Sequence, residues 1–326
     1  MKYVKPHLSY RDQVELLISR GLSCDDVDAA EQLLRRIGYY RLSAYWYPLR
    51  KPLPEDRKRH STVHYRLKEF APGHSFDDAA RLYAFDRRLR LHVMDGIEAF
   101  EVTLRVQIAH ILGRRDPFGH LHLAALDHRA GTIQRRSGLS RHDEWLEKWG
   151  QHVSAAKNED FVKHYLEKYD GHIPVWVATE IMDLGTLIRL FGLMRKDDTN
   201  EIARFFGVKT GRTMNGWLLG LNTIRNASAH HSRLWNRNLV HALPHLRTAD
   251  VGPDLHHIEH LADRRKIYGY LAVLASMLRA ADPTTRWPAN FRTLVRKAFP
   301  PVQGITARQA MSFPEDWESE PVWRHD

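Results

Sequence analysis

One short stretch, NTIRNASAHH at residues 222–231, holds three side chains suited to cleaving a phosphodiester bond. Arg225 stays charged, and its fork of donors matches two phosphate oxygens. His230 can accept or donate a proton near neutral pH, and Asn226 can orient His230 or a ribose. RNA supplies its own nucleophile, the 2′-hydroxyl, so this chemistry requires neither a metal nor a cofactor. The expected products carry a 2′,3′-cyclic phosphate and a 5′-hydroxyl, and DNA should resist cleavage.

Spacing alone does not single out this pair, because Arg-x4-His is a weak pattern that occurs five times in the chain. The strongest competitor is Arg105/His110, where Glu101 lies one helical turn before Arg105. The same Glu-to-Arg spacing also predicts an ordinary helix salt bridge. The remaining three pairs lie in irregular stretches or on a basic helix face: Arg59/His64, Arg115/His120 and Arg87/His92.

A helical wheel over residues 212–232 separates an apolar side from a polar stripe. The apolar side holds Trp217, Leu221, Ile224 and Ser228. The stripe gathers groups that can grip a phosphate: Asn222, Arg225, Asn226, His230 and Arg233. On this wheel Arg225 and His230 point about 140° apart, so one straight helix cannot direct both at one phosphorus atom. The geometry favours a composite site built by two copies of the chain, and a polar interface without chemistry is the alternative.

Helical periodicity and the lack of strand-like alternation predict an all-α fold. We expect long helices over residues 75–113, with Ser75 as the cap and Gly113 as the end, and over 173–194, 212–232 and 255–281. The aromatic stretch at 38–50 fits a core better than a base-stacking surface, although Arg41 within it is an RNA-binding candidate. The expected organisation is a helical segment at 1–50, a linker or long loop at 51–74, a helical core at 75–245, and a helical segment with a tail at 246–326.

Composition narrows the partners and the cellular setting. The 326 residues carry a formal net charge of +10, which should attract a polyanion such as RNA. A single cysteine, Cys24, excludes an internal disulfide framework, and no apolar run is long enough for a membrane span. We therefore expect a cytoplasmic protein without a membrane partner. The histidines at 256, 257 and 260 offer a weaker, metal-binding alternative that lacks an evident third ligand.

Several segments resemble, in order, the Abi-like abortive infection family, specifically the AbiD/AbiF group with a HEPN ribonuclease domain. RNASAHHSRLWNR is similar to the Arg-Asn-x3-His motif of HEPN ribonucleases. RRIGYYRLSAYWYPL, LYAFDRRLRLHVMDGIEAFEVTLRVQIAH and PVWVATEIMDLGTLIRLF are similar to other parts of the family, and together the likeness covers most of residues 5–240.

This resemblance implies a HEPN-type helical bundle with additional N- and C-terminal helices. It also implies metal-independent endoribonuclease activity in anti-phage defence, or as a toxin held by an RNA or protein antitoxin. By position, Arg225, Asn226 and His230 match the motif, Arg105 falls on the arginine of the long helix, and Glu180 takes a polar supporting role. Whether His110 completes a second active motif stays open, and with one motif a homodimer would build the site.

The sequence thus predicts a metal-independent HEPN endoribonuclease, with His230 moving protons and Arg225 holding the phosphate. The main alternative is a non-catalytic RNA-binding or scaffold protein that uses the same polar groove. A metal-dependent hydrolase using His256 and its neighbours is the third reading.

Overall fold

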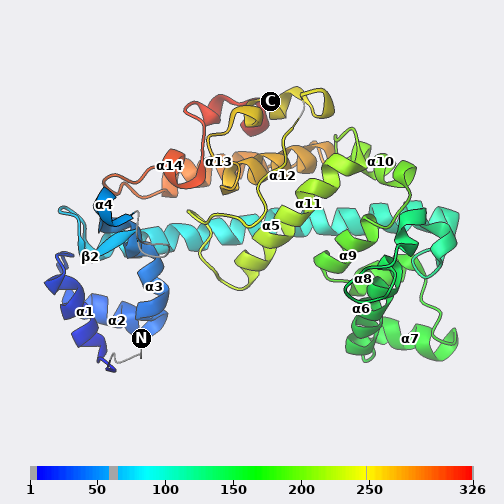
Figure 1. The fold of residues 1–326 in the computed structure, drawn as a ribbon, viewed down its shortest axis with the longest axis horizontal. Coiled ribbons are helices and arrows are strands. Elements are labelled where there is room, and N and C mark those ends of the chain that lie inside the picture. Colours follow the sequence, from blue (N-terminus) through cyan, green and yellow to red (C-terminus); the bar gives the residue numbers. More distant parts are fainter. Residues whose placement is uncertain (1–5, 59–64, 247, 325–326) are drawn as a thin grey trace. The chain divides into compact units, whose positions relative to one another are not determined.

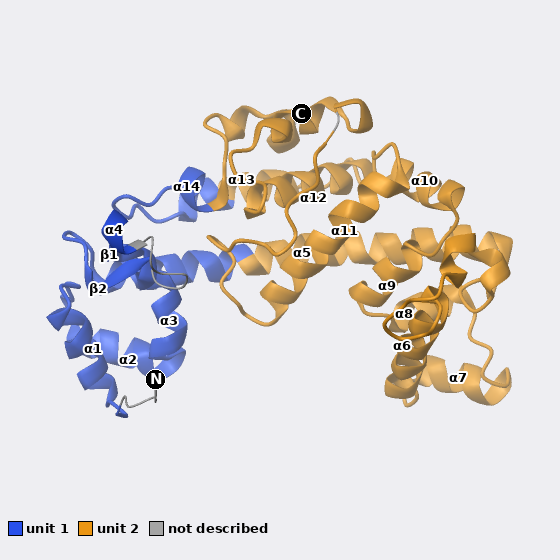
Figure 2. Cartoon of the chain, in the orientation of Figure 1, with its two compact units in different colours: residues 1–89, 294–310 blue, residues 90–293, 311–326 orange. Residues whose placement is uncertain are grey.

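The computed structural model describes residues 6–58, 65–246 and 248–324. The fold is all-α apart from one small two-stranded sheet, which confirms the predicted class (Figure 1). The chain divides into two compact units, one formed by residues 1–89 and 294–310 and the other by 90–293 and 311–326 (Figure 2). The Arg59/His64 pair lies outside the described residues.

Unit 1 opens with helices whose starts are fixed by local capping. Ser9 and Asp12 form a capping box, since the Asp12 amide donates to the Ser9 hydroxyl at 3.1 Å and the Ser9 amide donates to the Asp12 carboxylate at 3.2 Å. Asp26 caps the second helix by accepting from the amide of Ala29 at 2.8 Å. The elements are α1 (Tyr10–Ser19), α2 (Val27–Ile37), α3 (Tyr39–Trp46), α4 (Glu55–Lys58), β1 (Arg50–Pro52) and β2 (Arg66–Phe70).

The aromatic stretch forms α3 and lies largely in the core of unit 1. Leu42, Tyr45 and Trp46 are buried, and the hydroxyl of Tyr45 donates to the buried carboxylate of Asp86 at 2.6 Å. Arg41 is exposed on the same helix. Strands β1 and β2 pair antiparallel just beyond α3. Sequence alternation did not reveal them, because strands of three and five residues are too short to establish a period.

The long helix α5 (Phe76–Arg115) begins as predicted and ends later than predicted. The Asp78 amide donates to the Ser75 hydroxyl at 3.1 Å, which makes Ser75 the cap. Gly113 was wrongly expected to end the helix. It lacks the left-handed backbone of a terminating glycine, and it lies where a Cβ atom would approach Val175 to 3.1 Å and Trp176 to 3.3 Å. Gly113 therefore permits close packing against the next helices of unit 2.

Two stretches of unit 2 that were predicted as single helices are interrupted. The 173–194 stretch breaks at Met182, and Asp183 then caps a new helix by accepting from the Thr186 amide at 2.6 Å. The 255–281 stretch begins as a 3₁₀ helix and becomes α-helical only at Ile267. The unit 2 helices are α6 (Arg141–Ala156), α7 (Asp160–Lys168), α8 (Val175–Ile181), α9 (Leu184–Phe191), α10 (Lys196–Phe205), α11 (Gly211–Ala229) and α12 (Ile267–Ala281).

The segment after Pro283 includes α13 (Trp287–Ala298) and α14 (Ala307–Met311). Phe291 lies 4.9 Å from Trp323 and 6.3 Å from Trp317, measured between ring centroids, so an aromatic cluster holds this end of the chain on unit 2. Within the described ranges, each helix is too short or too polar to cross a bilayer. The 3₁₀ helices are η1 (Tyr47–Leu49), η2 (Leu123–Ala125), η3 (His128–Gly131), η4 (Thr248–Asp250), η5 (Pro253–His260), η6 (Trp317–Ser319) and η7 (Pro321–Trp323).

Candidate active site

Helix α11 carries the Arg-Asn-x3-His residues and is held by its apolar side. Trp217, Leu221, Ile224 and Ser228 are all buried, which confirms that side of the predicted wheel. At Gly220 an added Cβ atom would lie only 2.0 Å from the ring of Tyr270 on α12, so the two helices approach each other closely here. This packing fixes the rotation of α11 and leaves its opposite face available to the polar residues.

The end of α11 differs from the prediction, because the helix ends at Ala229 rather than at residue 232. The His230 amide still donates to the carbonyl oxygen of Asn226 at 3.0 Å, so His230 is the exposed C-cap. His231 then adopts a left-handed backbone with φ of 56° and turns the chain away. Arg233 consequently does not lie on the helical stripe on which the wheel had placed it.

Arg225 has an unusual environment for a partly buried guanidinium. Its Nη1 atom donates to Oδ1 of the adjacent Asn226 at 3.4 Å, a long bond. Its Nε atom is buried, and no group among the described residues accepts a hydrogen bond from it. No carboxylate of the described residues forms an ion pair with Arg225, and no described hydrogen bond joins it to His230. Arg225 therefore retains donors that an anion can use.

Asn222 lies one turn before Arg225 and faces α9. A Cβ atom added at Gly185 would lie 3.4 Å from the Nδ2 atom of Asn222. The side chain is half-buried, and it places an amide between the start of α9 and the Arg225–Asn226 pair. Of the predicted RNA-binding residues, Asn222 is thus the one on the same helix face as the motif, whereas Arg41 belongs to unit 1.

Arg105, the arginine of the competing motif, is held by three protein groups. Its guanidinium donates to the carboxylate of Glu101, to the carbonyl oxygen of Thr179, and to that of Met182 at 2.8 Å. Both carbonyls lie at the end of α8, where the break before α9 leaves them without helical partners. Arg105 thus donates hydrogen bonds to the free carbonyl groups at the end of an interrupted helix, and its side chain is only 13 % exposed.

His110 and Glu180 lie together, apart from α11. They line one pocket of about 410 Å³, along with Trp176 and Arg114. Arg114 is already paired with Glu201 by hydrogen bonds of 2.8 and 3.2 Å, and this contact lowers the pKa of the Glu201 carboxyl. Among the described residues, no hydrogen bond joins this pocket to Arg225 or His230, so the structure separates the two Arg-x4-His motifs into different environments.

The chain matches one known protein family over more than half of its length. Residues 32–236 match the family described as Abi-like protein, which is more than half of the sequence and includes all the motif residues above. The chain belongs to the Abi-like family. The family points to a role in abortive infection. Curated proteins and solved structures gave no match to this Abi-like protein.

The histidines of the metal-binding alternative have other surroundings in this Abi-like protein. His257 is largely buried, its Nε2 atom lies 2.9 Å from the hydroxyl of Tyr268, and burial lowers its pKa to about 4. Because 253–260 is a 3₁₀ helix, His256 and His260 do not have the one-turn α-helical spacing on which the proposal depended. In the described part of the chain, no three His, Cys, Asp or Glu side chains are grouped as metal ligands would be.

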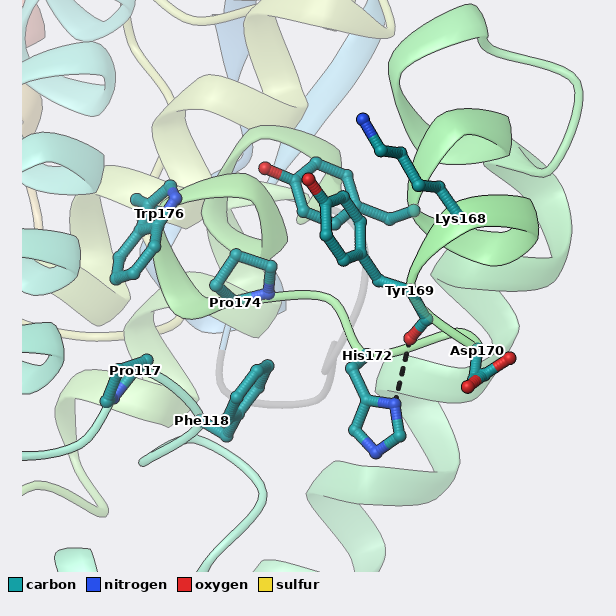
Figure 3. Close-up of a pocket in the computed structure, with 9 residues that line it drawn as sticks. Pro117, Phe118, Lys168, Tyr169, Asp170, His172, Pro174 and Trp176 are labelled. Atoms are coloured by element: carbon teal, nitrogen blue, oxygen red, sulfur yellow. Dashed lines mark hydrogen bonds between the residues drawn. The ribbon is translucent and has the colours of Figure 1, made fainter.

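The sequence reading missed the aromatic side chains that surround a second pocket of the Abi-like protein. Trp176, Tyr169 and Phe118 line it, at the ends of three different segments of unit 2 (Figure 3). A signal was present in HYLEKYDGHIPVW, where aromatic residues alternate with charged and turn-forming ones. The predicted helix over 173–194 covers only the end of this pattern, so the sequence did not indicate a binding surface in the turn before it.

Proposed function

We propose that this Abi-like protein is a metal-independent endoribonuclease of the HEPN type, acting in anti-phage defence or as the toxin of a toxin–antitoxin pair. The observation that carries the proposal is the state of Arg225, a partly buried guanidinium with no carboxylate partner among the described residues, on the helix that the exposed His230 caps. An arginine kept in this state suits a transient anion better than a structural role.

The contrast with Arg105 supports the choice between the two motifs. Both arginines are followed by a histidine five residues later, but Arg105 already binds a carboxylate and two carbonyl oxygens. A guanidinium held in this way has few donors left for a phosphate. We therefore assign catalysis to Arg225, Asn226 and His230, and positioning of α8 and α9 to Arg105.

In the proposed reaction, the 2′-oxygen attacks the phosphorus and the bond to the 5′-oxygen breaks. One basic group takes the proton of the 2′-hydroxyl, and one acidic group gives a proton to the leaving 5′-oxygen. Arg225 stabilises the charge on the phosphorane, and Asn226 orients the histidine or the ribose. Since one copy offers a single His230, a homodimer that brings two α11 helices together would supply both the acid and the base.

The test is cleavage of a mixed RNA pool in the presence of EDTA, with the 3′ ends of the products identified. Wild-type protein should leave cyclic-phosphate ends, and His230→Ala should lose about 10²- to 10⁴-fold in rate. His110→Ala is the matched control and should cleave like wild type. RNA bound but left intact would favour the non-catalytic RNA-binding alternative, and cleavage abolished by EDTA would contradict the metal-independent mechanism.

A further inference from the structure

The pocket beside the α7–α8 turn has the composition of a base-binding site. Its volume is about 490 Å³, and its lining includes Phe118, Tyr165, Tyr169, His172 and Trp176. Figure 3 shows Pro174 lying between the rings of Trp176 and Tyr169, with Phe118 below them. A recess lined by flat rings from separate segments offers several faces against which another planar group can stack.

The rings are exposed to an extent that folding alone does not explain. Trp176 is 49 % exposed and Tyr169 is 45 % exposed, although both are large apolar side chains. These rings lie at a turn that reverses the chain, where Asp170 (φ 50°) and Gly171 (φ 78°) adopt left-handed backbone conformations. Grouped exposed aromatic residues in a recess mark a binding surface more often than isolated ones do.

Charge indicates which planar ligand fits. The ammonium group of Lys168 lies 5.6 Å from the centroid of the Tyr169 ring, at the rim of the pocket. Asp170 also lines the pocket, and its carboxylate can accept hydrogen bonds from an amino group (Figure 3). A cation beside exposed aromatic rings suits a nucleotide, whose base can stack on a ring while its phosphate meets the lysine. The net charge of +10 favours a polyanionic strand over a basic or neutral peptide.

Trp176 connects this pocket to the one that holds His110 and Glu180, since it lines both. The two pockets therefore adjoin each other on unit 2.

We propose that the pocket lined by Tyr169 and Trp176 binds an unpaired base of a single-stranded RNA. The inference rests on the proposed function, in that it names the strand and the surface that the ribonuclease uses for its substrate. Bases in a duplex are stacked on one another and cannot enter, so the pocket should distinguish single-stranded from double-stranded RNA.

The test measures equilibrium binding by fluorescence anisotropy in the His230→Ala background, so that cleavage does not affect the result. The probes are a labelled single-stranded RNA of mixed sequence and the same strand annealed to its complement. Tyr169→Ala should weaken single-strand binding about 10-fold and leave duplex binding nearly unchanged. Tyr169→Phe keeps the ring and should bind like the parent protein. Tyr169 is the better first target, because Trp176 also packs against Gly113.

Phe161→Ala is the matched control, since Phe161 lies on the same helix, is 43 % exposed and does not line the pocket. Equal affinities of Tyr169→Ala and its parent for the single strand would overturn the inference. So would an equal loss for single-stranded and duplex RNA, or a parent protein that binds neither probe. Because the readout is binding, the inference stands or falls separately from cleavage, which the His230→Ala experiment on the RNA pool tests.

Discussion

The Nη2 atom of Arg105 donates a hydrogen bond of 2.8 Å to the carbonyl oxygen of Met182, a residue 77 positions further along the chain. This contact joins the long helix α5 to the break between α8 and α9. The same guanidinium also binds Glu101, whose side chain is 12 % exposed, so the three groups form one partly buried network. The position of the break, and of α9 against Asn222 of α11, therefore depends on a single side chain of α5.

Removing Arg105 should destabilise the fold. Arg105→Ala leaves the Glu101 carboxylate without its partner and two carbonyl oxygens without donors, which should lower the free energy of unfolding by about 3 kcal/mol. Urea unfolding followed by circular dichroism measures the change. His110→Ala, at an exposed position on the same helix, should change it by less than about 0.5 kcal/mol. Equal stability of the two variants would show that the network contributes nothing.

The form of the Arg225 side chain should matter as much as its charge. Arg225→Lys keeps a cation but loses the fork that can hold two phosphate oxygens, so we expect the cleavage rate to fall about 100-fold. The matched control is Arg212→Lys in the first turn of the same helix, where the side chain is exposed. That variant should cleave like wild type. An Arg225→Lys protein with full activity would reduce Arg225 to a source of general positive charge.

Two glycine substitutions in helices should act in opposite directions. Gly220→Ala places a Cβ atom 2.0 Å from the Tyr270 ring, so α11 and α12 must move apart, at a cost of about 2 kcal/mol or more. Gly150→Ala, within α6, meets no atom within 4 Å and should stabilise the protein by about 0.5–1 kcal/mol through helix propensity. Differential scanning calorimetry of both variants checks the signs, and a stabilised Gly220→Ala would contradict the close approach of the two helices.

Burial of His120 should make the protein sensitive to acid. The side chain is 0 % exposed and lies against Trp145 and Trp149, and burial, followed by the nearby His122 and His142, lowers its pKa to about 3. Folding then requires the neutral ring, whereas the unfolded chain takes up a proton below its ordinary pKa near 6.5. The stability from this residue is complete above that pH and decreases by about 1.4 kcal/mol per unit as the pH falls toward 3.

His120→Phe isolates this contribution, because other titrating groups affect wild type and variant alike. The difference in unfolding free energy between the two proteins should shift in favour of the variant by about 2 kcal/mol between pH 7 and pH 5. Urea titrations at several pH values provide the curves. Parallel pH profiles would mean that the pKa of His120 is the same in the folded and unfolded chains, which would contradict the effect of burial.

Structural features that depend on residues close together in the chain could be predicted from the sequence. The capping boxes at Ser9 and Ser75, the apolar side of α11, and the all-helical class follow from patterns within a few turns. The interruption of the helix at Met182 does not follow from such a pattern, because apolar residues continue on both sides of it. The broken helix is stable since Arg105, distant in sequence, binds its free carbonyls, and no local pattern carries that information.

The same limit applies to the candidate site. Spacing could not rank the pairs Arg105/His110 and Arg225/His230, since each reads as an arginine and a histidine on a helix. What separates them is the set of partners each guanidinium has in the folded chain. Gly113 shows the related difficulty: a glycine near a helix end predicts a terminator, but here its missing side chain leaves room for the neighbouring Val175 and Trp176.

The buried Nε atom of Arg225 has a consequence for the balance between stability and affinity. Stripping water from a guanidinium normally subtracts from the free energy of binding a phosphate. Here part of that dehydration takes place when the chain folds, so it weakens the fold rather than the complex, and the site is preorganised for its anion. An apolar side chain of similar length carries no charge to dehydrate, so it should stabilise the fold and abolish the affinity for phosphate. Arg225→Met is therefore expected to have a free energy of unfolding about 1 kcal/mol higher than wild type, as measured by urea titration. The same variant should lose its activity on RNA.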